Sequence, residues 1–433
     1  MNIAPRRHSL SLALSFVVLA SYGCDRSVGL TEPTMPSMSG APATAQEARA
    51  SMSAHAPDTF YDPPSNVPNK PGVLLRSELL KDVTLPEGLR GWRILYTTTI
   101  NDETPATAVA TVFAPIEMPS GPRPMIAWEH GTTGLLQKCM PSVTSAPTRG
   151  IPALERIVGA GWVIVATDYS FAEKGGPHPY VIGEGEARAT LDSIRAARQM
   201  PEVRLKPDTT DSFVLDNRTV VWGHSQGGHS ALWTGIVAPR YAPDIKILGV
   251  VAIAPAANMI DILERNQAID KRLGPYVALA YSRFYPDVNF EAALRPEARD
   301  AAREIVSLCG FVPLDDAKRI AVLSTTFEGG ALAMRTNRAL ESRLLQNVAD
   351  KPIAAPVVIA QGIADVVVPP AATGAYVEKR CGAGQRLEYW TVAGRDHGGI
   401  VEPGTPLAAP LMAWTSARFA DEPQADGCAR KSF

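Results

Sequence analysis

The residues best suited to carry chemistry lie in one short segment, TVVWGHSQGGHSALW, which runs from Thr219 to Trp233. Its centre, Gly223 to Gly227, fits the pattern G-x-S-x-G, with a strand-like run before it and a helix-compatible run after it. In that context the serine lies on a sharp strand–turn–helix, where the two glycines relieve crowding around a strained backbone. The N-terminus of the helix also favours negative charge that develops beside the serine. Ser225 is therefore the candidate nucleophile, and the competing interpretation is a structural serine in a tight turn.

A serine nucleophile needs a general base. On a strand–turn–helix fold of this kind the chain order is serine, then acid, then histidine. His397, in the glycine-rich loop AGRDHGG, is the histidine that follows Ser225 outside the GHSQGGH turn. His224 and His229 flank the serine in sequence, but on the turn and helix we expect them to point away from its Oγ. His130 precedes the serine, and we expect it to hold its loop. His397 is the candidate base.

The base in turn needs an acid that orients its ring. The segment PVVIAQGIADVVVPP places Asp365 shortly after a buried strand, in a loop closed by Pro369 and Pro370. Asp396 is adjacent to His397 in sequence and so badly placed to hold its ring, and we interpret it as a solvated loop carboxylate. Asp365 is the candidate acid.

A tetrahedral intermediate also needs two backbone N–H donors. One is expected from the residue after the nucleophile, Gln226, and the other from the loop after the third strand. That loop reads HGTTG, and its candidates are Gly131 and Thr132. The alternative is that the glycines of this loop only form a turn.

Short apolar runs and helical runs alternate along most of the chain. The helical run 185–200 carries Ala187, Leu191 and Ile194 at helical spacing. Apolar strands without strict alternation, separated by helices, predict an α/β fold with a mostly parallel central sheet flanked by helices on both faces. The expected strands are 92–100, 107–115, 124–131, 161–169, 219–225, 248–255, 356–362 and 387–394. Residues 258–350 break this rhythm and predict an inserted helical cap, which divides the core into 67–257 and 351–433.

The N-terminus predicts export. Residues 1–24 combine Arg6 and Arg7 with an apolar run too short to span a bilayer and small residues before Cys24. This pattern is typical of a signal peptide and is similar to a bacterial lipobox, in which case Cys24 is lipidated and anchors the chain to a membrane. The alternative is simple cleavage and a soluble periplasmic or secreted product. Residues 25–66, rich in Ser, Pro, Thr and Ala, predict a flexible spacer.

Composition excludes several other classes of protein. The chain is 45% apolar and 20% charged, which is typical of a globular protein, and its formal net charge is −2. That balance offers no electrostatic reason to expect a nucleic acid as partner. No phosphate loop or dinucleotide-binding glycine pattern stands in the strand and helix context that such sites need. We therefore expect no organic cofactor.

Together these segments resemble the secretory lipases, the α/β-hydrolases related to yeast lipase A. The resemblance extends from about Pro71 to Phe419 and rests on YTTTINDETPATAVATVFAP, HPYVIGEGEARATLDSIRAAR, GHSQGG, GIADVVVPP and the late DHGG. It implies an α/β-hydrolase fold with Ser225 as nucleophile, Asp365 as acid and His397 as base. It also implies a helical lid inserted after the sixth strand. Family members carry a more acidic loop where this sequence has EHGTTG, so the resemblance does not identify the second oxyanion donor.

Four cysteines remain once Cys24 is lipidated or removed, and disulfides persist in exported proteins. Four cysteines allow three pairings, and none of them has histidine support at metal-site spacing. A bridge from Cys381 to Cys428 would fix the C-terminal tail beside the loop of the candidate base. A bridge from Cys139 to Cys309 would tether the cap beside the active site, and the family resemblance implies the same arrangement. We predict both bridges, each stabilising the fold by roughly 2–4 kcal/mol.

The sequence thus predicts an exported serine carboxylic-ester hydrolase, a lipase or esterase that acts on a small-molecule or lipid ester through an acyl-enzyme. No metal or cofactor is expected to take part. One alternative is a serine peptidase of the prolyl-oligopeptidase type, but no repeats typical of a propeller precede the core. An acyltransferase would use the same acyl-enzyme. The non-enzyme alternative is a surface-anchored binding protein with an inactive hydrolase fold, against which the intact Ser, Asp and His set argues.

Overall fold

The computed structural model describes residues 58–433 except 102–103, 118–120, 171–175, 202–213 and 311–312. The expected signal peptide, the candidate lipidation site Cys24 and most of the expected spacer lie outside these described residues. Within them, no helix has both the length and the apolar character needed to cross a membrane.

The packed part of the chain begins before residue 66, the expected end of the spacer, because two aromatic side chains upstream of it are buried. Phe60 and Tyr61 are buried against a small apolar cluster that includes Leu95 and Met140. The hydroxyl of Tyr61 also lies 2.9 Å from Ser142 Oγ. Because two large rings remove much apolar surface from water, the packed part of the chain begins before the predicted boundary.

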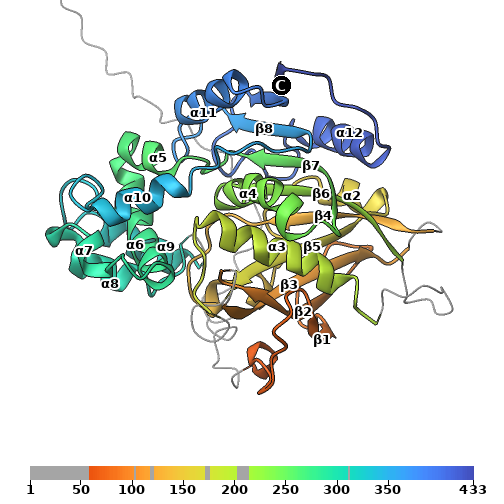
Figure 1. Cartoon of the computed structure of the whole chain (residues 1–433), viewed down its shortest axis with the longest axis horizontal. Coiled ribbons are helices and arrows are strands. Elements are labelled where there is room, and N and C mark those ends of the chain that lie inside the picture. Colours follow the sequence, from red (N-terminus) through yellow and green to blue (C-terminus); the bar gives the residue numbers. More distant parts are fainter. Residues whose placement is uncertain (1–57, 102–103, 118–120, 171–175, 202–213, 311–312) are drawn as a thin grey trace, which may run out of the picture. The chain divides into compact units, whose positions relative to one another are not determined.

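A ten-stranded sheet forms the centre of the described chain (Figure 1). The strands are β1 (Leu74–Leu79), β2 (Leu89–Thr99), β3 (Pro105–Pro115), β4 (Arg123–Glu129), β5 (Val163–Ser170), β6 (Leu215–His224), β7 (Lys246–Ile253), β8 (Val357–Gly362), β9 (Leu387–Val392) and β10 (Cys428–Ser432). Their order across the sheet is β1-β2-β3-β5-β4-β6-β7-β8-β9-β10. The pairs β1–β2, β2–β3 and β3–β5 are antiparallel. Every other pair of neighbouring strands, from β5–β4 across the sheet to β9–β10, is parallel. The eight strands expected from the sequence are all present, whereas β1 and β10 were not among them.

Helices cover both faces of this sheet. They are α2 (Leu154–Gly159), α3 (Gly183–Ala197), α4 (Gln226–Tyr241), α11 (Pro370–Gly382) and α12 (Ala408–Phe419), with the short 3₁₀ turns η1 (Thr59–Tyr61), η2 (Gln137–Cys139) and η3 (Pro141–Val143). In β6, Val221 faces the layer formed by α3 and α4, while Val220 and Trp222 face the layer that contains α12. Both faces are therefore apolar, which explains why the central strands do not alternate with polar residues.

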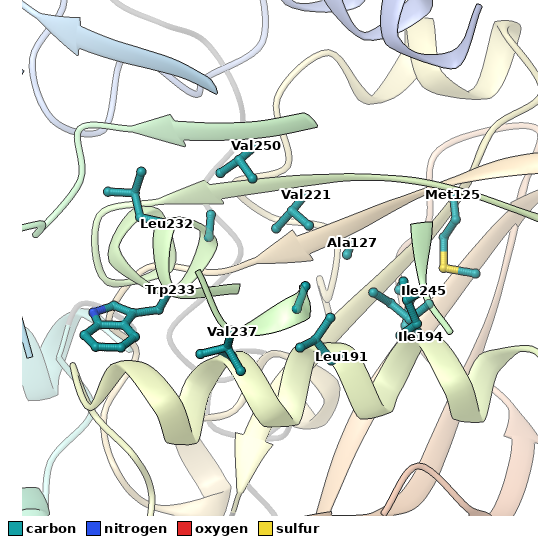
Figure 2. Close-up of a cluster of buried hydrophobic side chains, with 14 of the residues drawn as sticks. Met125, Ala127, Leu191, Ile194, Val221, Leu232, Trp233, Val237, Ile245 and Val250 are labelled. Atoms are coloured by element: carbon teal, nitrogen blue, oxygen red, sulfur yellow. The ribbon is translucent and has the colours of Figure 1, made fainter. Parts of the chain in front are cut away.

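The layer beneath α3 and α4 shows how helical spacing in the sequence becomes packing. Leu191 of α3, Val221 of β6 and Val237 of α4 lie together in one buried cluster (Figure 2). Their side chains are at most 2% exposed. Full burial of each such side chain contributes about 1.5–3 kcal/mol, so this contact holds α4 firmly against the sheet. The prediction of a mostly parallel sheet between helices is confirmed.

Between β7 and β8 the chain forms helices that share a core of their own. They are α5 (Met259–Arg265), α6 (Gln267–Phe284), α7 (Phe290–Ala293), η4 (Pro296–Ala298), α8 (Arg299–Ile305), α9 (Leu314–Leu323) and α10 (Arg338–Gln346). Within the described residues of this segment, one isolated antiparallel β-bridge joins Leu294 to Leu332. Figure 1 shows these helices gathered beside one end of the sheet. This is the segment that the sequence predicts as the inserted cap.

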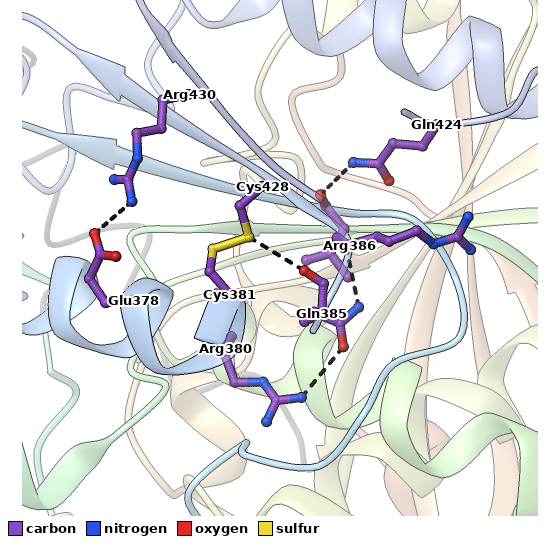
Figure 3. The surroundings of a disulfide bond; sticks show 9 residues. Glu378, Arg380, Cys381, Gln385, Arg386, Gln424, Cys428 and Arg430 are labelled. Atoms are coloured by element: carbon purple, nitrogen blue, oxygen red, sulfur yellow. Dashed lines mark hydrogen bonds and ion pairs between the residues drawn. A yellow bond between two sulfur atoms is a disulfide. The ribbon is translucent and has the colours of Figure 1, made fainter. Parts of the chain in front are cut away.

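Two disulfides pair the cysteines as expected, Cys139 with Cys309 and Cys381 with Cys428. The second lies between α11 and the start of β10 (Figure 3). Every residue of β10 is exposed, so this strand buries little and depends on its hydrogen bonds to β9 and on the disulfide. That exposure also explains why the charged segment CARKS does not indicate a strand in the sequence.

Replacing both cysteines of this bridge, Cys381→Ser with Cys428→Ser, is expected to lower the free energy of unfolding by about 2–4 kcal/mol, because the unfolded chain loses a covalent constraint. Amide hydrogen exchange in β10 should accelerate, since the strand then keeps only its edge pairing. Urea unfolding and exchange mass spectrometry measure the two effects against the oxidised wild type. Wild-type values for both would contradict the proposed anchoring of β10.

Candidate active site

Ser225 lies at the turn between β6 and α4, with a strained backbone at φ 58° and ψ −117°. The chain is so close-packed here that the two flanking glycines have no room for a side chain. A Cβ on Gly223 would lie 1.9 Å from the carbonyl oxygen of Gly227, and one on Gly227 would lie 1.8 Å from that of Glu129. The glycine spacing of the motif is therefore a steric requirement of this turn.

The structure brings together the three side chains that the sequence singles out. His397 Nε2 lies 2.8 Å from Ser225 Oγ, and His397 Nδ1 lies 2.7 Å from Asp365 Oδ2. Ser225 is 9% exposed and Asp365 is 3% exposed. The chain of two hydrogen bonds can move a proton from the serine hydroxyl to the imidazole and can stabilise the imidazolium that results.

Asp365 is held as a carboxylate by four donors. Besides His397, it accepts hydrogen bonds from Gln361 Nε2 at 3.0 Å and from the N–H groups of Val367 and Val368 at 2.8 and 2.9 Å. Burial raises the pKa of the Asp365 carboxyl, but the hydrogen bond and charge of His397 and the two N–H groups outweigh it and hold the pKa below 3.8. The carboxylate is thus fixed in position and charge before any substrate arrives.

His224 supports the loop of His397, a role that the sequence did not reveal. As expected it does not bond the serine, but its ring lies 4.7 Å from that of His397, centroid to centroid. Its Nε2 donates to the carbonyl oxygen of His397 at 2.8 Å. Burial and the proximity of His397 lower the pKa of His224 to about 3, so the ring is neutral and keeps this donor. His224 lies directly before the nucleophile, but no local pattern of the sequence indicates its bond to the loop of His397.

The loop after β4 lies against the nucleophile. A Cβ placed on Gly131 would be 3.4 Å from Ser225 Cβ. Thr132 lines the same cavity as Ser225 and Gln226, and its Oγ1 lies 2.9 Å from the hydroxyl of Tyr180. Gln226 is the first residue of α4, so its N–H has no acceptor within the helix. The residues that carry the candidate oxyanion donors therefore lie close to Ser225.

Contacts from both sides hold this loop in place. On one side the buried His130 donates through Nδ1 to the carbonyl oxygen of Gly131 at 2.6 Å, and Tyr169 donates to the carbonyl oxygen of His130 at 3.1 Å. On the other side the N–H of Gly310 donates to the carbonyl oxygen of Thr133 at 2.8 Å. The expected role of His130, to hold the loop, agrees with these contacts.

A narrow cavity opens from Ser225 toward the helical insertion. Its walls beyond the nucleophile are apolar, and α5 and α6 contribute much of them. The lining residues are Thr132, Tyr180, Ser225, Gln226, Ala256, Met259, Ile262, Ile269, Leu273, Val367 and Val368. Such a wall suits an apolar chain attached to the reacting carbonyl.

Asp396, the alternative acid, is exposed and accepts a hydrogen bond from the N–H of Gly399 at 2.7 Å. It acts as a cap within its own loop and has no contact with the ring of His397 among the contacts of the described residues.

In the part of the chain that the structure describes, no three His, Cys, Asp or Glu side chains are grouped to hold a metal ion.

This sheet with its serine turn defines an α/β-hydrolase. A model of the secretory lipase family matches residues 148–427, more than half of the chain, and the protein belongs to that family.

The relatives include proteins named as lipases and one named as a probable inactive lipase. A probable inactive lipase of Mycobacterium tuberculosis is 24% identical over 399 residues, covering 87% of this chain and 85% of the relative. A secreted triacylglycerol lipase of Malassezia globosa is 24% identical over 423 residues, covering 90% and 86%. The crystal structure of Candida antarctica lipase A is similar with a TM-score of 0.67 at 19% identity, covering 85% of this chain and 86% of that one. This likeness confirms the α/β-hydrolase fold.

The crowding at the serine turn predicts a sharp difference between two glycines. Gly227→Ala should destabilise the protein by at least about 3 kcal/mol, the upper end of what overpacking costs, because its Cβ meets the backbone of β4. Gly374→Ala in α11 is the matched control, since nothing lies within 4 Å of its Cβ. There alanine should stabilise by about 0.5–1 kcal/mol. Urea unfolding of both variants tests this, and similar stabilities would contradict the steric account.

Proposed function

We propose that this member of the secretory lipase family is a serine carboxylic-ester hydrolase with Ser225 as nucleophile, His397 as base and Asp365 as acid. The observation that carries the proposal is the chain of hydrogen bonds of 2.8 and 2.7 Å that joins these side chains at a strained turn. The strain supports the assignment because backbone outliers persist only where the surrounding packing enforces them.

In the proposed reaction Ser225 Oγ attacks the ester carbonyl while its proton moves to Nε2 of His397. Asp365 stabilises the imidazolium through Nδ1–H, and the imidazolium then protonates the leaving alcohol. The acyl group remains on Ser225 until a water molecule, activated by the same imidazole, attacks it and releases the acid. The serine, the imidazole and the carboxylate regain their starting protonation at the end of the cycle.

The negative charge on the carbonyl oxygen needs donors on the side opposite the base. We assign the N–H of Gln226 as the first donor, because it begins α4 and lacks an acceptor within the helix. The second comes from the loop of Gly131 and Thr132, which lies within contact distance of Ser225. Donors fixed before the reaction contribute strongly, since removal of one typically slows turnover by ~100- to 1,000-fold.

The apolar cavity supports an ester with an aliphatic or otherwise apolar acyl chain as substrate. Met259 and Ile262 of α5 and Ile269 and Leu273 of α6 line it, so the insertion would enclose the acyl chain. We therefore interpret residues 258–350 as a lid. The apolar lining favours a lipid ester, and the triacylglycerol activity named for the Malassezia globosa relative is one candidate.

The non-enzyme alternative, an inactive hydrolase fold, corresponds to the relative that is named as a probable inactive lipase. An inactive fold would not need a serine, an imidazole and a carboxylate at hydrogen-bonding distance, nor a carboxylate with four donors. These contacts are costly to maintain in a buried site without a function, because each polar group that is buried must be satisfied. They favour an active enzyme.

We also propose that the enzyme is exported, as the secreted relatives and the family suggest. Lipidation of Cys24 remains a separate prediction for a residue outside the described part of the chain. Mass spectrometry of the mature protein from membranes would identify a lipidated Cys24.

Ser225→Ala tests the function directly. Hydrolysis of a p-nitrophenyl ester series should fall by at least about 10⁴-fold at every chain length, because the nucleophile is gone. The free energy of unfolding should stay close to that of the wild type. A fluorophosphonate probe should label the wild type and leave the variant unlabelled. An unlabelled wild type would favour the inactive-fold alternative, and a labelled variant would assign the nucleophile elsewhere.

Asp365→Asn tests the acid. The amide presents a donor where four donors already converge and favours the wrong tautomer of His397, so kcat should fall by about 10³- to 10⁴-fold. Asp396→Asn is the matched control, because it changes a carboxylate in the loop of His397 and keeps the oxygen that accepts from Gly399. Its kcat should stay within about three-fold of the wild type. Larger loss in the Asp396 variant than in the Asp365 variant would reverse the assignment.

A further inference from the structure

A buried carboxylate that the proposed mechanism does not use lies behind the serine turn. Glu186, in the first turn of α3, is 0% exposed. Its Oε1 accepts from Gln226 Nε2 at 2.9 Å and from the N–H of Val181 at 3.0 Å. Its Oε2 lies 2.9 Å from His229 Nδ1. One side chain therefore bonds two residues in the first turn of α4 and the segment that precedes α3.

Both ring nitrogens of His229 take part in a hydrogen bond. Its Nε2 lies 2.8 Å from the carbonyl oxygen of Asn347, which can only accept, so Nε2 carries a hydrogen. Its Nδ1 faces Glu186, and two acceptors without a proton between them would repel each other. A proton is therefore shared in this contact, whichever atom holds it. Either position of the proton gives a hydrogen bond between Glu186 and His229.

Through Gln226, Glu186 contacts one half of the proposed oxyanion site. Gln226 supplies the first backbone donor, and its side chain is nearly completely buried. Because Gln226 Nε2 and His229 Nδ1 bond the same carboxylate, the first turn of α4 is held at two points three residues apart. Rotation of the Gln226 peptide would break the first of these bonds.

Through Val181, Glu186 is also linked to the loop of Gly131 and Thr132, the other half of the proposed oxyanion site. Val181 has φ 47°, an unfavourable conformation for a β-branched residue, and its N–H is held by Glu186. The preceding residue, Tyr180, lies 2.9 Å through its hydroxyl from Thr132 Oγ1 in the candidate oxyanion loop. The Glu186 carboxylate thus connects the first turn of α4, which carries the Gln226 donor, with the segment of Tyr180 and Val181. That segment in turn bonds the loop of Gly131 and Thr132, which carries the second donor.

We propose that Glu186 is a positioning residue that aligns both oxyanion donors, the N–H of Gln226 and that of the Gly131–Thr132 loop. The proposal rests on the proposed function of this site. The role requires a hydrogen-bond acceptor behind the turn, whereas helix packing alone would be served by an apolar side chain at lower desolvation cost. Misalignment of donors by about 1 Å can cost ~100-fold in rate without weakening substrate binding.

Asp192 provides a matched control on the same helix. It is also 0% exposed, and it accepts from the hydroxyl of Tyr241 at 2.7 Å and from Arg195 at 3.0 Å. Tyr241 ends α4, about 20 Å from its first turn at 1.5 Å per residue. Loss of this carboxylate removes one part-buried hydrogen bond between the same two helices and one within α3, without touching the serine turn.

The experiment compares Glu186→Met, Glu186→Gln and Asp192→Asn in the full chain, with p-nitrophenyl butyrate well below all unfolding temperatures. Glu186→Met removes the acceptor and should lower kcat by roughly 10- to 100-fold with KM within about two-fold of the wild type. Glu186→Gln should recover most of that loss, because its oxygen still accepts from Gln226 and Val181 while its amide donates to a neutral His229. Asp192→Asn should lower Tm but leave kcat within about three-fold.

A Glu186→Met variant that loses Tm but keeps wild-type kcat would overturn the proposal, as would a Gln variant as impaired as the Met variant. If Glu186→Met does not fold, Gln226→Met tests the proposal in its place. This variant removes the side-chain hydrogen bond to Glu186 and keeps the backbone N–H of residue 226. It should lower kcat by about 10-fold, and a wild-type kcat would overturn the proposal. Ser225→Ala separates the two hypotheses: if it retains activity the proposed function fails, and if it is inactive only the role of Glu186 is under test.

Discussion

The close approach of three backbone segments at Ser225 is the constraint on which the rest of the site depends. The end of β6, the start of α4 and the end of β4 meet so closely that Gly223 and Gly227 could not carry a Cβ. This contact forces the serine into a strained conformation and places its hydroxyl at the carboxyl edge of the sheet, where His397 contacts it. Because α4 is packed by Val237 and its neighbours against the sheet, the strain cannot relax by a shift of the helix.

The other site residues reach the same point because parallel strands end together. Asp365 follows β8 and His397 follows β9, and these strands end at the same edge as β6. Loops alone would leave such side chains mobile, and here hydrogen bonds to the backbone hold each loop. Val367 and Val368 donate to Asp365, and His224 donates to the carbonyl oxygen of His397. The result is a site in which little reorganisation is needed when charge develops.

The sequence was informative where function depends on local pattern. The serine turn, the chain order of its partners and the break in rhythm that marks the helical insertion all follow from neighbouring residues. It was uninformative about the hydrogen bonds that support the site residues from other segments. The bond from His224 to His397 spans 173 positions and that from Glu186 to Gln226 spans 40, and no local pattern indicates either. The strand β10 was missed for a different reason, because an exposed edge strand need not be apolar.

The disulfides connect each cysteine of the described chain to the next one along it, Cys139 to Cys309 and Cys381 to Cys428. A chain that crosses a membrane from its N-terminus presents these thiols to an oxidising compartment in that order. Oxidation of each thiol with the next to emerge then yields the native bridges directly, without a non-native intermediate that must be rearranged. Thiol–disulfide rearrangement takes minutes to hours without a catalyst. For a chain exported as we propose, the pairing of consecutive cysteines favours formation of both native bridges without an isomerase.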